Sequence, residues 1–458
     1  MIPKEKFVES FYNFKLSLDN DALLMYNTKR GTVVLLESRQ AKEFENYLEN
    51  PKYDSNSSLI SELKKLGFLI EPDANELNEI RAWHDKFRKD KRLLHITMLP
   101  SESCNFACPY CFQYQKRNKF MKDWVYEAVL NFIKNITLEN QAIGEETYVK
   151  INWFGGEPLL QANKIINFHE KLKILSENLN LKYDAVVVTN GYLLNPHLMK
   201  TFVNLGIKDF QVTLDGNKDT HDSLRRLKNG SGTFDTIYTN LKCIRDLPKE
   251  YRFRILIRVN FLKNSLSSVY ELIDKFKEDF SHDDRFHIYC RPVYDFETTR
   301  NDIVSIDSQI LPFQEAIERQ RDLAFKIIYE LKYKSLGILT EPLPFPAPLW
   351  CPVERWYSYI FGADGLIFPC ETYIGNTQES VGYIEKDGTI RFNENLYKWK
   401  KTIFDEENSY CLSCKLLPVC MGGCKRERLK HVSNKACYWN EEIILDTMQK
   451  FYFLLKNE

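Results

Sequence analysis

The stretch LLHITMLPSESCNFACPYCFQ (residues 93–113) joins an apolar, strand-like run to three closely spaced cysteines, Cys104, Cys108 and Cys111. Three thiolates at this C-x-x-x-C-x-x-C spacing can bind three irons of a cubane iron–sulfur cluster and leave the fourth iron without a protein ligand. An open metal position distinguishes a reactive site from a structural one. Cysteine clusters also bind structural zinc, so a zinc knuckle or buried thiols are the alternative at this point.

Composition limits the possible partners. The chain has 458 residues, enough for two or three domains. Lys plus Arg and Asp plus Glu number 63 each, so no net charge favours nucleic acid or a membrane surface. No apolar run reaches the length of a membrane span, and the N-terminus lacks the features of a signal peptide. We therefore expect a cytoplasmic protein whose twelve cysteines serve as metal ligands rather than disulfides.

Patterning divides the chain into three predicted domains, at residues 1–90, 91–340 and 341–458. In the first, strand-like pieces precede helical ones, and a charged stretch at 86–92 links it to the second. The proline-rich run PLPFPAPLW at 342–350 marks the next boundary. The last domain holds seven of the twelve cysteines and several glycine turns. This composition is typical of a domain stabilised by metal.

The middle domain alternates β-rich apolar runs with amphipathic helical stretches. The strand candidates are residues 93–99, 148–154, 183–189, 209–214, 253–260 and 285–291. Six βα units in series predict an α/β fold, with a parallel sheet that has helices outside it and is either open or part of a barrel.

Polar or glycine-rich residues follow each of the first four predicted strands. After the cysteine triad come GGEP at 155–158, TNG at 189–191 and Asp215 with Gly216. Active sites of barrels and open sheets form at the carboxyl ends of the strands. We therefore expect one shared pocket at these loops.

This arrangement resembles the radical S-adenosylmethionine (AdoMet) superfamily, and the resemblance implies a partial (β/α)6 TIM-like barrel. It implies that the triad binds a [4Fe–4S] cluster, whose electron cleaves AdoMet to a 5′-deoxyadenosyl radical that abstracts hydrogen from substrate. The implied AdoMet-contacting residues are Tyr110, Gly155, Gly156, Glu157, Thr189, Asn190, Thr213, Asp215 and Arg225. Strand-end turns are the alternative for the Thr, Asn and Asp positions. For His221 and Arg225, in HDSLRR, a structural ion pair is the alternative.

The C-terminal cysteines resemble the SPASM domain, which carries two auxiliary [4Fe–4S] clusters, so three clusters are implied in all. The resemblance assigns the first auxiliary cluster to Cys351, Cys370 and Cys424, and the second to Cys411, Cys414, Cys420 and Cys437. A zinc ribbon is the alternative. Seven ligands are one short of two full clusters. Cys290, a non-cysteine ligand or a substrate thiolate could complete the first, and Cys290 and Cys243 are otherwise interpreted as buried thiols.

The N-terminal segment, ending in LKKLGFLIEPDANE at 63–76, resembles the winged-helix-like element with which many peptide-modifying SPASM enzymes bind a leader. Such elements add an extended peptide to a sheet edge. A stabilising cap on the barrel is the alternative.

Together the resemblances imply a radical AdoMet/SPASM maturase of a ribosomally made (RiPP) precursor peptide, with a flavodoxin or ferredoxin as electron donor. Thioether cross-linking is the expected reaction, and a carbon–carbon or carbon–oxygen link is second. An anaerobic sulfatase maturase is the alternative enzyme, with Glu371 as catalytic base where that family typically has Asp. A non-catalytic, metal-stabilised binding protein is a third reading.

Overall fold

The computed structural model describes residues 6–50, 57–113, 117–294, 306–331, 343–406, 409–430 and 437–456. The chain divides into two compact units. Unit 1 comprises Met1–Lys89, Gly337–Arg355 and Lys401–Glu458, and unit 2 comprises Asp90–Leu336 and Trp356–Lys400. The segment after residue 341 therefore contributes to both units.

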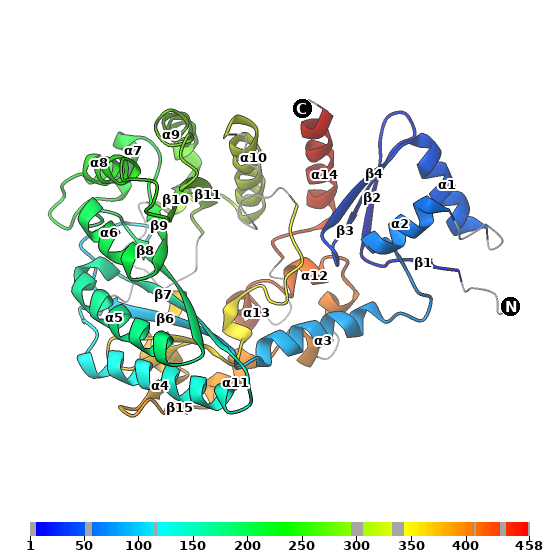
Figure 1. Ribbon diagram of the computed structural model, residues 1–458. Helices are drawn as coiled ribbons and strands as arrows, with labels where there is room; N and C mark the ends of the chain where they lie inside the picture. Colours follow the sequence, from blue (N-terminus) through cyan, green and yellow to red (C-terminus); the bar gives the residue numbers. More distant parts are fainter. Residues whose placement is uncertain are drawn as a thin grey trace. The chain divides into compact units, whose positions relative to one another are not determined.

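Unit 2 is built on a ten-stranded sheet in the order β11-β10-β9-β8-β7-β6-β12-β13-β14-β15. Six strands run parallel: β6 (Leu93–Ser101), β7 (Thr147–Gly155), β8 (Leu181–Thr189), β9 (Ile207–Thr213), β10 (Arg254–Phe261) and β11 (Phe286–Pro292). They are the six predicted strands, so the predicted α/β fold is confirmed. Figure 1 shows helices outside these strands. The carboxyl ends of the six strands lie at one edge, where a site is expected.

Four short strands continue this sheet beyond β6. They are β12 (Ser358–Phe361), β13 (Leu366–Phe368), β14 (Gly382–Ile384) and β15 (Ile390–Phe392). The first pairs parallel with β6, and the others pair antiparallel with one another. The sequence did not predict them, because runs of three or four residues carry too little alternation to stand out from loops.

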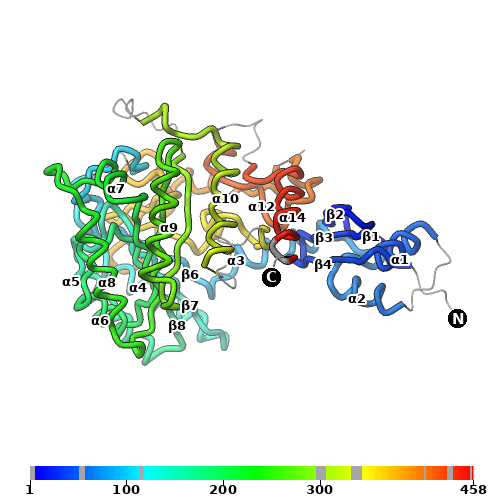
Figure 2. The backbone as a smooth tube through the Cα atoms, turned by 90° about the horizontal axis from the view of Figure 1, so that it is seen from above, coloured from blue at the N-terminus to red at the C-terminus, as the bar shows by residue number. Residues whose placement is uncertain are grey.

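Helices cover one face of the parallel strands, as Figure 2 shows from above. They are α4 (Asp123–Gln141), α5 (Ala162–Asn178), α6 (Pro196–Asn204), α7 (Lys218–Leu224), α8 (Phe234–Arg245), α9 (Leu266–Asp279) and α10 (Phe313–Leu331). A further helix of this unit, α11 (Asn395–Lys400), follows β15 in the chain. Alternation along β10 explains the packing. Ile255, Ile257 and Val259 are at most 1% exposed. Leu256 and Arg258, between them, are half-buried and point to the opposite face.

Unit 1 contains a three-stranded antiparallel sheet in the order β2-β3-β4. Its elements are β1 (Val8–Glu9), β2 (Asn13–Ser17), β3 (Leu23–Asn27), β4 (Thr32–Leu36), α1 (Ser38–Glu49), α2 (Ser58–Leu66), β5 (Leu69–Ile70), α3 (Glu76–Lys89), α12 (Leu417–Cys420), α13 (Lys425–Lys430) and α14 (Glu441–Lys456). Leu23 and Met25 pack against α1 and α2 on one face. Leu24 and Tyr26 pack against α12 and α14 on the other. Because both faces are covered, β3 is apolar along nearly its whole length.

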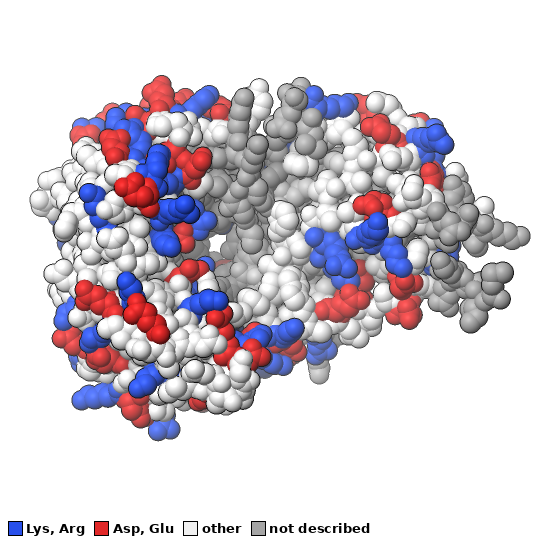
Figure 3. All heavy atoms as spheres, in the orientation of Figure 1, with Lys and Arg blue, Asp and Glu red and all other residues white. Residues whose placement is uncertain are grey.

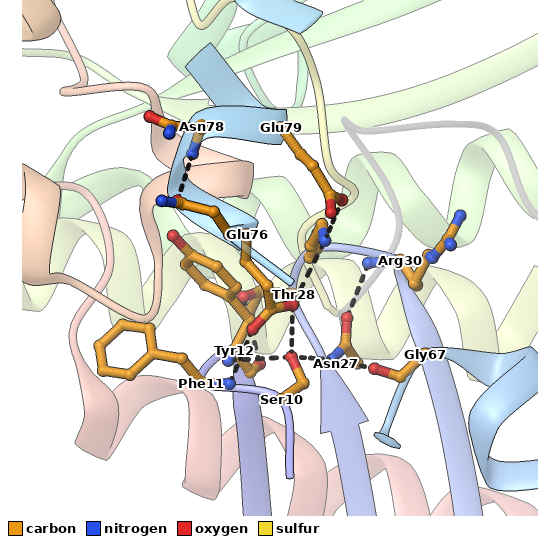
Figure 4. A network of polar contacts seen from close by, with 12 residues as sticks. Ser10, Phe11, Tyr12, Asn27, Thr28, Arg30, Gly67, Glu76, Asn78 and Glu79 are labelled. Carbon is orange, nitrogen blue, oxygen red and sulfur yellow. Dashed lines mark hydrogen bonds and ion pairs between the residues drawn. The ribbon is translucent and has the colours of Figure 1, made fainter. Parts of the chain in front are cut away.

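A buried polar network joins this sheet to the start of α3 (Figure 4). The Glu76 carboxylate accepts hydrogen bonds from Ser10 Oγ and Phe11 N, both at 2.9 Å. The Asn27 amide donates to Ser10 Oγ at 3.1 Å. A buried carboxylate is tolerated when such donors surround it, and here it fixes where α3 leaves the sheet.

Side-chain charges of both signs alternate over the face shown in Figure 3. This distribution agrees with the equal counts of 63 basic and 63 acidic residues. Within the described ranges, the structure contains no helix with the length and apolar composition that crossing a membrane requires.

Candidate active site

The cysteine loop follows β6 directly, and its backbone is tied to the segment after α7. Ala107 N donates to Arg226 O at 2.9 Å, and Lys228 N donates to Asn105 O at 3.0 Å. Cys104 is 8% exposed. These bonds hold the loop against a second part of the same unit, so its cysteines are positioned by tertiary contacts as well as by spacing.

The thiols of Cys104, Cys108 and Cys111 lie close enough to influence one another. Burial raises the pKa of the Cys108 thiol to about 12, Arg225 opposes the rise, and the other two cysteines add to it. Metal binding has to displace this proton, since the thiolate is the ligand. No three His, Cys, Asp or Glu side chains in the described ranges converge tightly enough to share one metal ion. Three cysteine thiols on one short loop are a donor set that fits three irons of a cubane cluster.

The two glycines of GGEP press against the cysteine loop. Gly156 N donates to Ser101 O at 2.9 Å, and Glu157 N donates to Ser103 O at 2.9 Å. A Cβ on Gly155 would lie 2.3 Å from Ser101 O, and one on Gly156 would lie 2.3 Å from Ser103 O. Only glycine fits so close a backbone approach.

The Glu157 carboxylate is satisfied from within the chain. It accepts from Leu159 N at 3.0 Å, Thr189 Oγ1 at 2.7 Å and Asn190 N at 2.8 Å. Its side chain caps the short 3-10 helix Pro158–Gln161 and ties β7 to the loop after β8. Burial raises its pKa, and these three hydrogen bonds oppose the rise. Contact between this carboxylate and an AdoMet ammonium stays a prediction.

Asn190 links the TNG turn to the cysteine loop. Its Nδ2 donates to Asn105 Oδ1 at 2.8 Å and lies 4.0 Å from Cys104 Sγ. Thr213, by contrast, is paired in register with Arg258 on β10 and has no hydrogen bond to the loop among the described contacts. The predicted pocket residues are therefore brought together at the ends of β6, β7 and β8, and Thr213 lies beside them on β9.

Asp215 is the centre of a second polar cluster. Its carboxylate accepts from the Tyr110 hydroxyl and from Asn260 N at 2.9 Å. Arg225 donates to the Tyr110 hydroxyl at 2.8 Å and lies 3.9 Å from the carboxylate. Burial raises the pKa of Asp215, and the Arg225 charge opposes this rise. The sequence did not single out Asn260, although its position at the end of the fifth strand follows the same rule as the other four loops.

His221 positions this cluster as a neutral side chain. Asp215 N donates to His221 Nδ1 at 3.1 Å, so the other ring nitrogen carries the proton and lies 3.0 Å from Thr233 Oγ1. Burial lowers the pKa of His221 well below its usual value. Within the described ranges His221 forms no ion pair, whereas Arg225 of the same run pairs with Asp215 at 3.9 Å.

The cysteines predicted for the second auxiliary cluster gather in unit 1. Burial raises the pKa of the Cys420 thiol to about 12, and Cys437, Cys411 and Cys414 add to the rise, so all four lie near one another. Lys415, between two of them, donates from Nζ to Asn13 O at 3.1 Å. The loop that carries Cys411, Cys414 and Cys420 is thus hydrogen-bonded to β2. Sequence reasoning missed this contact, because no local pattern signals it.

The other predicted ligands are distributed over both units. Cys351 and Cys424 belong to unit 1, whereas Cys370 and Glu371 follow β13 in unit 2. Burial raises the pKa of Glu371, and the Arg258 charge opposes the rise. A shared cluster across these residues stays a prediction.

The two remaining cysteines differ from each other. Cys290 is 4% exposed and paired in register with Val259, on the helix-covered face, which supports its interpretation as a buried thiol. Cys243 is exposed, so the same interpretation is wrong for it. The buried face of α8 is formed by Ile237, Leu241 and Ile244, and position 243 falls outside that face.

Comparison with known proteins places these features in a family. Residues 98–276 match the sequence model of the Radical SAM superfamily. The chain is 25% identical over 376 residues to a cysteine-type anaerobic sulfatase-maturating enzyme of Clostridium novyi, covering 79% of this chain and 95% of that protein. It is 23% identical over 477 residues to the radical SAM cyclopropyl synthase TigE of Paramaledivibacter caminithermalis, covering 93% and 90%. The solved structure of native anSMEcpe with bound AdoMet and Cp18Cys peptide shares the fold, with a TM-score of 0.52 at 18% identity over 80% of this chain and 97% of that one.

Proposed function

Since this chain is a radical SAM superfamily enzyme, with the family's domain at residues 98–276, we propose that it oxidatively modifies a ribosomally made peptide. The observation that carries the proposal is the convergence of the cysteine loop, the GGEP turn and the Asp215 cluster at one edge of the unit 2 sheet. When bound there, AdoMet and its [4Fe–4S] cluster supply the radical chemistry. SPASM-type auxiliary clusters, held by the seven C-terminal cysteines, are part of the proposal.

The chain's own residues bind, orient and exclude water. Cys104, Cys108 and Cys111 would hold the radical-generating cluster, and the GGEP backbone would lie against AdoMet. Glu157 and Asp215 are each 1% exposed. These buried side chains keep the loops rigid and the pocket dry, which protects a reactive intermediate from solvent.

A cysteine thioether is the bond we favour, because the seven auxiliary-cluster cysteines leave room for a peptide thiolate on iron. The carbon would lose a hydrogen atom to the radical derived from AdoMet, the thiol would lose a proton, one S–C bond would form, and an auxiliary cluster would accept the remaining electron. Carbon–carbon or carbon–oxygen linkage is the alternative product class.

Co-expression with any short peptide encoded beside the gene, under anaerobic and iron-replete conditions, tests this function. We expect the peptide to lose hydrogens in pairs and its cysteines to resist alkylation. Cys104→Ala should abolish both changes, because one iron of the cluster loses its ligand. The exposed thiol on α8 offers a matched control, and Cys243→Ala should leave the modification unchanged. An unmodified peptide in a preparation that cleaves AdoMet would contradict the proposal.

The leader of that peptide is proposed to add to the sheet of unit 1 along β4. Among the described strands, β4 pairs only with β3. The opposite edge strand, β2, already bonds to Lys415 through Asn13 O. Val33 and Val34 are half-buried on β4 and Leu35 is exposed, so an apolar edge is available for an extended segment.

Leu35→Glu should weaken binding of the precursor peptide at least fivefold and leave AdoMet cleavage without peptide unchanged. A charge beside the edge opposes docking of an apolar leader, and the side chain is exposed enough to be replaced without repacking. Fluorescence anisotropy with the labelled precursor measures the effect. Trp83→Glu, an exposed apolar position on α3, is the control. Equal affinity of both variants would exclude the β4 edge.

A sulfatase maturase is the second candidate, favoured by the C. novyi relative, of which 95% is covered. In that case Glu371 is the base, and Glu371→Gln should slow formylglycine formation on a cysteine-containing sulfatase peptide at least 100-fold, the low end for a lost general base. Glu385→Gln is the surface control. Under our proposal the wild-type enzyme forms no formylglycine on this peptide, and mass spectrometry of the product decides between the two.

A further inference from the structure

The face of β10 and β11 that points away from the helices carries two arginine side chains. Arg258 and Arg291 are both half-buried there. Asn260 stands opposite Arg291 in the register, and Arg258 shares the face of Asn260, so the two arginines are diagonal neighbours. Within the described ranges, neither forms an ion pair with Asp or Glu.

The contacts of these two arginines leave most of their guanidinium N–H groups free to bind a ligand. Arg258 donates from Nε to Asn260 Oδ1 at 2.8 Å, and its two terminal nitrogens bond to no other described residue. Arg291 makes a long contact of 3.5 Å with Gln320 Oε1 and hydrogen-bonds to Tyr294. A partly buried cation without a counter-ion is costly, which suggests that a ligand supplies the negative charge.

Tyr294 shows that the two arginines converge. Burial raises the pKa of its hydroxyl, and the charges of Arg291 and Arg258 both oppose the rise. Two carboxyl groups on this side, Glu371 and Asp215, lie close enough for the Arg258 charge to act on their pKa values. Within the described ranges neither forms an ion pair with Arg258 or Arg291, and Asp215 already pairs with Arg225 at 3.9 Å.

We propose that Arg258, Arg291 and the Tyr294 hydroxyl form a subsite for a carboxylate, occupied by an Asp or Glu side chain of the peptide substrate. The inference rests on the proposed function. The fork of an arginine binds a carboxylate through two parallel hydrogen bonds. Asn260 contacts both Arg258 and Asp215, so the subsite adjoins the predicted AdoMet pocket. The acidic residue would therefore lie beside the residue that loses hydrogen.

A display library of random dodecapeptides, presented anaerobically to the cluster-loaded enzyme with saturating AdoMet, tests the subsite. The peptides that the wild-type enzyme retains should contain Asp or Glu at least tenfold more often than Asn or Gln. Arg258→Gln and Arg291→Gln should each remove this enrichment. Arg254→Gln is the matched control, because this arginine lies on the same strand but is exposed and paired with Asp209 at 2.9 Å.

The outcomes separate the possible sources of the carboxylate. Retained peptides without acidic enrichment overturn the subsite, and so does retention of no peptide. Both outcomes leave the proposed function intact, because the precursor is proposed to bind through its leader at β4 and the co-expression experiment tests that function separately. If Arg258→Gln instead weakens AdoMet binding tenfold and the acidic enrichment persists, the anion is the cofactor's own carboxylate and the subsite is overturned. Arg291 has no bond to the Asp215 cluster, so its variant tests the subsite even if Arg258→Gln disturbs that cluster.

Discussion

A Gly156→Ala variant is expected to lose at least 100-fold in AdoMet cleavage, although the change adds one methyl group and removes no predicted ligand. The new Cβ would lie 2.3 Å from Ser103 O, 2.5 Å from Ser103 C and 2.9 Å from Cys104 N. All three atoms are backbone, so relief requires the cysteine loop itself to move. Displacement of a reacting group by about 1 Å costs roughly 100-fold in rate.

AdoMet cleavage by anaerobically reconstituted protein, together with the iron–sulfur absorption, measures this effect. Gly144→Ala is the matched control. Gly144 has a φ of +79° and nothing within 4 Å of a built Cβ. Its variant should lose about 1 kcal/mol of stability through backbone strain and keep normal cleavage. Full activity of Gly156→Ala would mean that the loop tolerates a shift and that the GGEP contact does not position the cluster.

Asp215→Asn is expected to destabilise unit 2 by about 3 to 5 kcal/mol, the usual cost of leaving one charge of a buried pair alone. The Arg225 guanidinium, 7% exposed as a residue, would lose the only carboxylate with which it pairs within the described ranges. An asparagine keeps the shape of the side chain, but its NH2 group cannot accept the hydrogen bonds that one carboxylate oxygen now accepts from Asn260 or Tyr110. The affinity for AdoMet should fall together with the stability of unit 2, because the polar cluster around Asp215 joins three loops of the predicted pocket.

Urea unfolding of the anaerobic protein measures the loss. Asp235→Asn, at an exposed ion pair with Lys218, should change stability by less than about 1 kcal/mol. The double variant Asp215→Asn with Arg225→Met should recover part of the loss, since no buried charge remains. If the two changes lowered the free energy of unfolding additively, the proposed coupling between Asp215 and Arg225 would be contradicted.

The parallel sheet was predictable because β6 to β11 are seven to nine residues long and are separated by amphipathic helices. The short strands β12 to β15 were not, since their pairing depends on β6 and on one another rather than on local pattern. The cysteine loop, GGEP and Asp215 were also predictable, because strand-end residues of a parallel sheet meet at one edge. The sequence did not predict that Asn260, His221 and Thr233 position the polar cluster around Asp215. Those roles depend on contacts between separate loops, which no local pattern reveals.

By itself, the sequence determined the α/β class and the radical SAM family and predicted the candidate site residues, because strand periodicity and cysteine spacing are local properties. Only the tertiary structure decided the partners of those residues. Glu157 is bound by donors from two loops. Lys415 docks the loop after Cys414 on β2 through Asn13, 402 residues away in sequence. Arg258 and Arg291 become neighbours through strand register. Such contacts join segments that are distant in the chain, and burial and register, rather than spacing, bring them together.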